Sequence, residues 1–329
     1  MTLKKYKKIE KVAIVTGTRA EYGILKPLIA KVYKDPVFEL QLIVVGMHLS
    51  EIFGVTINEI KQDGFPIAAK ICMYDDSLFK DIKYHGIGLG KGIIEFTSIL
   101  PELKPDIILV LGDRLEALAA VLAAATLNIP IGHIHAGDRT ESGHIDEQIR
   151  FSISRFSHIL FAPTKRSAER LVAMGEEPWR VHNIGALGVD SVLSVKPMLR
   201  EELEKVIELD LTKPTAIVIF HPVIHEYDTI GSQMREIMEA IKELKLQSVV
   251  IYPNNDLGSS KIIEVIEEYR EKLPYIKVFK NLKHEVFVNL MRHASVMIGN
   301  SSCGIIEAPS LGLPFVHVGT RNKGREHGD

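Results

Sequence analysis

The stretch from Leu109 to Arg150 reads LVLGDRLEALAAVLAAATLNIPIGHIHAGDRTESGHIDEQIR and decides the fold. It holds two apolar runs, each followed by polar residues and then by a segment of helix length. A short apolar run that ends in a polar turn is typical of a buried parallel strand. Parallel α/β sheets bind ligands beyond the carboxyl ends of their strands, so we expect the functional site in these turns. The polar residues there are Asp113, Arg114, His135, Asp138 and Arg139.

Two further charged residues of this stretch, Asp146 and Arg150, are four apart. That spacing places them on one face of a helix, which we expect to begin near His144. Taken alone, they fit an ordinary ion pair on a helix surface, which is worth a few tenths of a kcal/mol.

The composition excludes several classes of protein. The chain has 329 residues, enough for two domains, and a formal net charge of −2 without a basic stripe for nucleic acid. The apolar runs are too short for a membrane span, and the N-terminal lysines predict a solvated tail and not a signal peptide. Two cysteines, Cys72 and Cys303, make neither a disulfide scaffold nor a metal motif. We therefore expect a reducing, cytoplasmic setting. The tail lysines are Lys4, Lys5, Lys7, Lys8 and Lys11.

Strand-like and helix-like segments alternate along the whole chain, a pattern that predicts doubly wound parallel sheets. A charged, helical segment at 193–212 is expected to link two domains. We therefore predict two similar Rossmann-like α/β domains facing a cleft, with residues 1–190 carrying the first and 191–329 the second. The expected strands are 11–19, 40–46, 68–74, the two apolar runs that precede Asp113 and His135, 158–164 and 181–185 in the first domain, and 215–222, 248–254, 275–282, 295–302 and 314–319 in the second.

A phosphate site is expected in the second domain, in GNSSCGIIEAPSLG (299–312). A buried strand ends at Gly299, and a helix begins near Ser301 and Ser302. Backbone N–H groups and the positive end of the helix dipole would face the cleft, with two hydroxyls as further donors. Glu307 is placed further along to accept from ribose hydroxyls. The alternative is that Ser301 only caps the helix.

The turn GTRAEYG (17–23) is the matching feature of the first domain. A glycine turn exposes N–H groups beside Arg19, whose guanidinium suits phosphate oxygens. Gly17 by itself is equally compatible with a plain turn. Opposite the Ser301 turn, Arg19 would complete a clamp on a diphosphate.

The histidines allow more than one interpretation. His133 and His135 lie two apart on a strand, and with Asp138 or His144 they would make a metal site. No other ligand spacing supports that, so we favour a buried, hydrogen-bonded His133 and predict neither a metal nor a cofactor. His221 ends a strand of the second domain and should face the cleft as a donor to the diphosphate or an acid for the leaving group.

Six segments together resemble the UDP-N-acetylglucosamine 2-epimerase family, and most closely its hydrolysing branch, which serves sialic-acid-type sugars. The resemblance covers nearly the whole chain. It implies two Rossmann-like domains of the glycosyltransferase-B type with a UDP-sugar in the cleft, and a homo-oligomer. The composition already predicts no nucleic-acid or membrane partner. The segments are GTRAEYGILKPLI (17–29), LVLGDRLEALAAVLAA (109–124), HIHAGDRTESGHIDEQIRFSISRFSH (133–158), FHP (220–222), YPNND (252–256) and GNSSCGIIEAPSLGLPFVHVGTRNKGRE (299–326).

The resemblance also assigns roles to individual residues. Asp113, Asp146 and Arg150 would lie around the sugar, with a contribution from His48, so Asp146 and Arg150 become more than a surface pair. Inversion at C2 needs a carboxylate base of raised pKa and a cationic clamp on the departing UDP. Asp113 or Asp146 would be the base. The residues implied to hold the nucleotide are Arg19, Arg114, His221, Asn254, Ser301, Ser302, Glu307 and Arg321, with the backbone near Leu282 beside the uracil.

Two features depart from the family pattern. His135 stands where many members carry a glutamate, which leaves the role of that position open. Members usually continue past the GREHG loop into a closing helix, which we expect this second domain to lack. The alternatives to a hydrolysing epimerase are a non-hydrolysing epimerase, which keeps UDP attached, and a UDP-sugar binder without catalysis. A glycosyltransferase is disfavoured because no feature for an acceptor is present.

Overall fold

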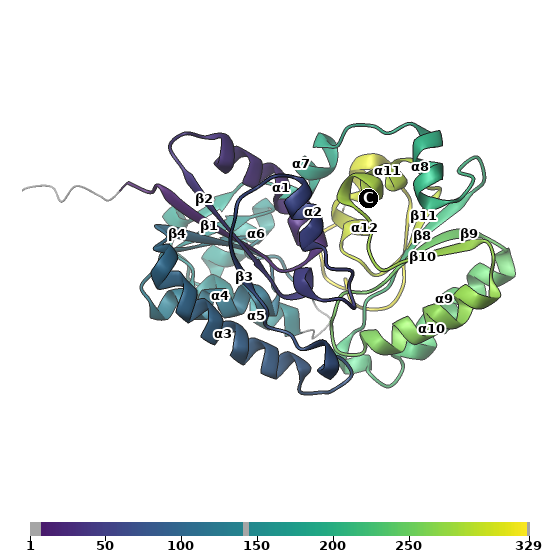
Figure 1. Ribbon diagram of the computed structural model, residues 1–329, viewed down its shortest axis with the longest axis horizontal. Coiled ribbons are helices and arrows are strands. Elements are labelled where there is room, and N and C mark those ends of the chain that lie inside the picture. The colour runs from purple at the N-terminus through teal and green to yellow at the C-terminus, as the bar shows by residue number, and fades with distance from the viewer. Residues whose placement is uncertain (1–7, 141–144, 328–329) are drawn as a thin grey trace, which may run out of the picture.

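The computed structural model describes residues 8–140 and 145–327, and it has two halves, each built on a parallel sheet (Figure 1). Lys4, Lys5, Lys7 and His144 lie outside the described residues. The first sheet has the order β3-β2-β1-β4-β5-β6-β7, and the second has the order β10-β9-β8-β11-β12. The strands are β1 (Lys11–Thr16), β2 (Glu39–Val45), β3 (Ile67–Ile71), β4 (Ile107–Leu111), β5 (Ile131–Ile134), β6 (Ile159–Ala162), β7 (Val181–Asn183), β8 (Thr215–Ile219), β9 (Gln247–Ile251), β10 (Ile276–Phe279), β11 (Val296–Gly299) and β12 (Phe315–His317).

Helices cover both faces of each sheet, as the alternation of strand and helix predicted. The α-helices are α1 (Arg19–Lys34), α2 (Ile57–Gln62), α3 (Tyr84–Leu103), α4 (Leu115–Thr126), α5 (Ile145–Phe156), α6 (Lys165–Ala173), α7 (Leu187–Ser194), α8 (Arg200–Ile207), α9 (Ile230–Leu244), α10 (Ser259–Lys272), α11 (His284–His293) and α12 (Cys303–Ile306). Short 3₁₀ turns are η1 (Gly46–Leu49), η2 (Asp76–Leu78), η3 (Pro178–Arg180), η4 (Ile224–Glu226) and η5 (Ala308–Leu311). Within the described ranges, no helix is both long enough and apolar enough to cross a membrane.

The period of two along β1 explains the two cores of the first half. Ala13 and Val15 face α3, α4 and α5, whereas Val12 and Ile14 face α1 and α2. Because both faces are covered, nearly every residue of this strand is buried. β8 repeats the arrangement in the second half, where alternate residues face α8 and α11 on one side and α9 and α10 on the other. The predicted fold class is therefore confirmed.

The expected linker helix over 193–212 is wrong. Two helices, α7 and α8, occupy this region, and the break between them contains Pro197, which is unfavourable in a helix interior because it lacks a backbone N–H. Leu203 and Ile207 of α8 are fully buried in the second half, so that helix is part of a domain and not a connection. The boundary predicted at residue 190 falls within α7 and stays a prediction.

Helix α7 packs against both halves at one end of the cleft. The hydroxyl of Ser191 donates to the carbonyl oxygen of Gly23 in α1 at 2.6 Å, and it lies 2.7 Å from Nε2 of His284 in α11. A side-chain carbon at Gly23 would come within 2.5 Å of the His284 ring, so the contact between α1 and α11 requires a glycine. The next residue, Val192, is fully buried in the core of the second half.

Candidate active site

A cavity of about 550 Å³ lies between the two halves, at the carboxyl ends of strands from both sheets. This volume is within the range of small-molecule sites. The position is the one that parallel sheets favour for ligands. Nearly all residues that the sequence analysis selected line this one cavity: Arg19, Asp113, Arg114, Asp146, Arg150, His221, Asn254, Ser301, Ser302, Glu307 and Arg321.

Two selected residues lie behind the cavity wall. Leu282 is 4% exposed and packs in the core of the second half, while its neighbours Lys280 and Asn281 line the cavity. His48 is fully buried, and its ring nitrogens lie 3.0 Å from the hydroxyl of Thr16 and 2.8 Å from that of Thr56. The side chains of Leu282 and His48 thus do not line the cavity, and the expected place of the backbone near Leu282 beside a uracil stays a prediction.

Asp113 follows β4 and is ion-paired with Arg150, which is nearly fully buried on α5. Arg150 also donates to the carbonyl oxygen of Asp138 at 3.2 Å. Burial alone would raise the pKa of Asp113, but the charges of Arg150, Arg325 and Arg321 outweigh it and hold this pKa below its usual value. This direction does not match the raised pKa that a catalytic base needs, and the choice between Asp113 and Asp146 as the base stays a prediction.

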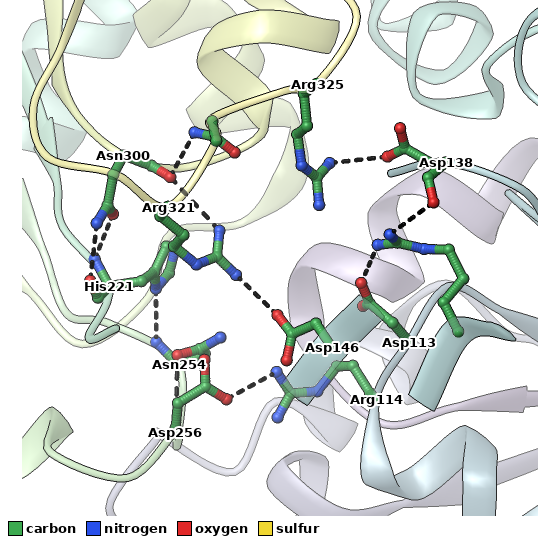
Figure 2. A network of polar contacts seen from close by, with 12 residues as sticks. Asp113, Arg114, Asp138, Asp146, His221, Asn254, Asp256, Asn300, Arg321 and Arg325 are labelled. Carbon is green, nitrogen blue, oxygen red and sulfur yellow. Dashed lines mark hydrogen bonds and ion pairs between the residues drawn. The ribbon is translucent and has the colours of Figure 1, made fainter. Parts of the chain in front are cut away.

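The last loop of the described chain contributes two arginines that reach across the cleft to the first half (Figure 2). Arg321 lies 3.6 Å from Asp146, at the start of α5, and Arg325 lies 3.0 Å from Asp138, after β5. Sequence analysis selected Arg321 but missed Arg325, although both lie in the resembling segment that ends in KGRE. The sequence of that loop does not indicate a partner for Arg325, because its partner Asp138 lies in the other half and is brought near only when the two halves dock.

His221 follows β8 and lines the cavity with one defined tautomer. Its Nδ1 accepts a hydrogen bond from the backbone N–H of Asn254 at 3.2 Å, and burial lowers its pKa to about 3. A neutral imidazole with an accepting Nδ1 carries its proton on Nε2. Asn300 holds the backbone by accepting from the N–H of His221 at 2.6 Å and donating to its carbonyl oxygen at 2.8 Å. His221 is thus built as a hydrogen-bond donor.

The turn after β11 requires a glycine. Gly299 has φ +139°, and a side-chain carbon there would lie 1.8 Å from the carbonyl oxygen of Ile219 on the adjacent β8. Ser301 and Ser302 follow and line the cavity. The proposal that Ser301 caps the helix is wrong: Ser302 is the N-cap residue, and Ser301 instead accepts from the thiol of Cys303 at 3.0 Å.

The helix after this turn is shorter than expected. α12 has four residues and is followed by η5, whose second residue is Pro309. Pro309 has no backbone N–H to donate, so it does not favour continuation of the α-helix past this point. The dipole of so short a helix is small, so hydroxyl and N–H donors of the serine turn carry the anion-binding capacity.

Arg19 and Glu307 face one another from opposite halves. Arg19 is ion-paired with Glu59 at 3.5 Å, and a terminal nitrogen of its buried guanidinium has no acceptor among the described residues. Burial lowers the pKa of Arg19 to about 10, so it stays charged at neutral pH. Burial raises the pKa of Glu307 to about 7, against the attraction of Arg19. The residue that begins α1 and the residue that follows α12 therefore lie close together on the cavity surface.

Arg114 is engaged by protein groups. Its Nε lies 3.2 Å from Glu116, a terminal nitrogen lies 3.6 Å from Asp256 of the second half, and the other donates to the side chain of Asn255. These attractions raise its pKa despite burial. Arg114 thus joins the two halves, and its expected role in holding a nucleotide stays a prediction.

The two neighbouring histidines have different environments. His133 is fully buried, with its Nδ1 2.9 Å from the hydroxyl of Ser154 and its Nε2 2.7 Å from the carbonyl oxygen of Gly112, which confirms the buried, hydrogen-bonded interpretation. His135 lies past the end of β5 with φ +62° and lines the cavity, where burial lowers its pKa to about 4. Among residues 8–140 and 145–327, no cluster of three His, Cys, Asp or Glu side chains is arranged to hold a metal ion.

Two parallel-sheet domains with a polar cavity between the ends of their strands define a glycosyltransferase-B-like fold. A solved structure with this fold, the UDP-GlcNAc 2-epimerase from Neisseria meningitidis bound to UDP-GlcNAc, superposes with a TM-score of 0.77 at 22% identity, over 93% of this chain and 82% of that one. At this identity the likeness concerns the fold.

Sequence comparison identifies the family. The model described as UDP-N-acetylglucosamine 2-epimerase matches residues 30–329. A UDP-N,N'-diacetylbacillosamine 2-epimerase (hydrolyzing) from Legionella pneumophila is 38% identical over 98% of this chain and 84% of its own length. A UDP-N-acetylglucosamine 2-epimerase from Neisseria meningitidis serogroup B is 35% identical over 97% of this chain and 82% of its own length. The chain belongs to the UDP-N-acetylglucosamine 2-epimerase family.

Proposed function

We propose that the protein is a hydrolysing 2-epimerase that acts on UDP-N-acetylglucosamine or a 2,4-diacetamido-trideoxy relative. Its products are UDP and a C2-inverted, N-acetylmannosamine-type sugar. One observation carries the proposal: donors suited to a diphosphate and carboxylates suited to proton transfer line the same cavity. The name of the Legionella relative supports the hydrolysing reaction and the diacetamido substrate.

The proposed reaction has two stages. In the first, a base removes the C2 proton, the C–H electrons form a C1=C2 double bond, and the C1–O electron pair leaves with UDP. The product is a 2-acetamidoglycal. In the second, water adds its hydroxyl to C1, and C2 receives a proton on the face opposite to the one it lost. No oxidant or reductant is needed.

The site residues have separable roles in this scheme. Because its pKa is lowered, Asp113 is a weak base, so we propose Asp146 as the group that removes the C2 proton. Asp113 and Arg150 would then hold the sugar. Arg19, Arg321, the Nε2–H of His221 and the turn at Ser301 would stabilise the charge that develops on UDP.

One incubation tests the reaction. The enzyme is mixed with UDP-N-acetylglucosamine, and separately with the diacetamido substrate, in D₂O and followed by ¹H and ³¹P NMR. Free UDP together with a C2-deuterated, inverted free sugar is the expected result. A deuterated epimer still attached to UDP would assign the non-hydrolysing reaction. UDP binding without deuteration would overturn catalysis and leave a nucleotide-sugar binder.

A further inference from the structure

Asn255 is a fully buried polar residue on the loop after β9, and it is buried against the other half of the molecule. Its carbonyl oxygen accepts a hydrogen bond from Nε2 of His85 at 2.8 Å, and its side-chain oxygen accepts from Arg114. Its amide faces the hydroxyls of Tyr74 and Tyr84. All four partners belong to the first half, so this loop inserts a side chain into a socket on the opposite domain.

The socket is formed by packing within the first half. The rings of Tyr74 and Tyr84 stack with centroids 4.9 Å apart, and His85 lies edge-on to Tyr84 at 5.1 Å. A side-chain carbon at Gly88 would come within 2.6 Å of the Tyr74 ring, so α3 carries a glycine where this ring packs. The stacked rings therefore have a fixed place before Asn255 enters.

This contact lies at the end of the cleft away from α7. In Figure 1, α7 is at the top of the molecule, and α3 and α10 approach one another at the bottom. Lys80, ahead of α3, is ion-paired with Glu264 of α10 at 2.7 Å on the same side. The two halves are therefore joined at both ends of the cavity, through α7 and through the Asn255 socket, in addition to the ion pairs of Arg321 and Arg325.

The same loop also reaches the candidate active site. The residue before Asn255 donates its backbone N–H to Nδ1 of His221, and the residue after it is ion-paired with Arg114. Docking of Asn255 thus determines where that N–H lies, and hence which nitrogen of His221 carries the proton.

We propose that Asn255 is a positioning residue: its insertion between Tyr74, Tyr84, His85 and Arg114 holds the halves closed and thereby orients His221 toward the cavity. The role in catalysis rests on the proposed function. The closure itself does not, because it concerns contacts between the two halves.

The test compares N255A with K80A. Lys80 and Glu264 are exposed, and an exposed ion pair contributes little, so K80A is the matched control for a contact on the same side of the cleft. By small-angle X-ray scattering without and with UDP, N255A is expected to be more extended than wild type, and K80A equal to it. Loss of hydrogen bonds to charged or buried groups predicts at least about a tenfold fall in kcat/KM for N255A.

Two further measurements separate positioning from a merely structural role. Long-range ¹H–¹⁵N NMR of His221 should show the Nε2–H tautomer in wild type and a mixture of tautomers in N255A. H85A should resemble N255A, whereas H85Q, which keeps a donor, should restore the wild-type scattering. H85A leaves the loop intact, so it serves if N255A does not fold.

The outcomes distinguish this proposal from the proposed function. Wild-type compactness and a single His221 tautomer in both N255A and H85A would overturn the role of Asn255. Turnover that is absent in wild type would overturn the epimerase, while scattering would still decide whether Asn255 closes the cleft.

Discussion

The guanidinium of Arg325 lies 3.0 Å from the carboxylate of Asp138, joining the last described loop of the second half to the turn after β5 in the first. Arg325 is 8% exposed and Asp138 18%. A second ion pair is formed by the next residue of the loop: the guanidinium of Arg170 in α6 lies 3.7 Å from the carboxylate of Glu326. This loop therefore closes one wall of the cavity with matched charges from both halves.

Replacing Arg325 should change the pH profile. Arg325 is one of the cations that hold the pKa of Asp113 down, so R325Q should raise that pKa. The acid limb of kcat/KM should then move to higher pH. R325K keeps the charge and should leave the limb in place. An unmoved limb in R325Q would show that Asp113 does not govern it.

The carboxylates at the sugar end should separate turnover from binding. D146N should lower turnover by about a hundredfold or more, since general acid–base groups contribute on that scale, and D113N should also lower it, because the proposed contact of Asp113 with the sugar is lost. UDP affinity should be nearly unchanged by calorimetry. D210N, an exposed change in the second half, is the control. Joint loss of UDP binding and of folding would assign both aspartates a structural role.

The serine turn and Glu307 should act on the nucleotide. S302A and E307A should each weaken UDP binding by about 1.5 to 3 kcal/mol, the range for hydrogen bonds to charged groups. Both side chains line the cavity. Calorimetric titration with UDP checks this, with S310A, an exposed change on η5, as the control. Undiminished affinity in both variants would place the diphosphate elsewhere.

Buried histidines should make stability fall with acid. Burial lowers the pKa of His133 to about 3, against 6.5 as its ordinary value. Between these pH values the unfolded chain binds a proton that the folded chain does not, so the free energy of unfolding falls as pH drops below 6.5. One such group contributes a slope of up to about 1.4 kcal/mol per pH unit. Urea unfolding from pH 7.5 to 5 should show a shallower slope for H133N than for the exposed control H182N.

Two glycine substitutions should have opposite effects. G299A places a carbon against the Ile219 carbonyl at a positive φ and should destabilise the second half strongly. Gly231, in the first turn of α9, has open space around it, so G231A should stabilise by roughly 0.5 to 1 kcal/mol. Urea unfolding of both variants checks the pair; equal effects would contradict the geometry at Gly299.

The strands and the location of the site were predictable because they follow from local patterns. Apolar runs such as the one before Asp113 are buried on both faces, and their carboxyl ends meet at one edge. Once the two sheets face one another, Asp113 from one and Ser301 from the other share a cavity. The family resemblance added the role of each residue. The homo-oligomer and the cytoplasmic setting stay predictions, since neither is a property of one chain's fold.

The partners of the charged residues were not predictable, because they depend on how the halves dock. Arg150 of α5 is ion-paired with Asp113, which follows β4. Asp146 of α5 is ion-paired with Arg321, which lies in the other half. Asn255 carried no signal beyond the resembling segment in which it lies, since the groups that bond it, on His85 and Arg114, belong to the first half. Pro197, by contrast, was a local signal that favoured a break in the expected linker helix.

Helix α7 limits how relatives of this protein can be recombined. Ser191 donates a hydrogen bond to the first half, and the adjacent Val192 packs into the core of the second half. A hybrid protein joined at this point would therefore combine residues from two parents whose packing partners differ. Hybrids that exchange whole halves between family members should therefore inherit α7 whole, together with the α1 and α11 surfaces it touches. A crossover in the segment between α7 and α8 keeps α1 and α7 from one parent and leaves only the contact of α7 with the second half, including α11, unmatched.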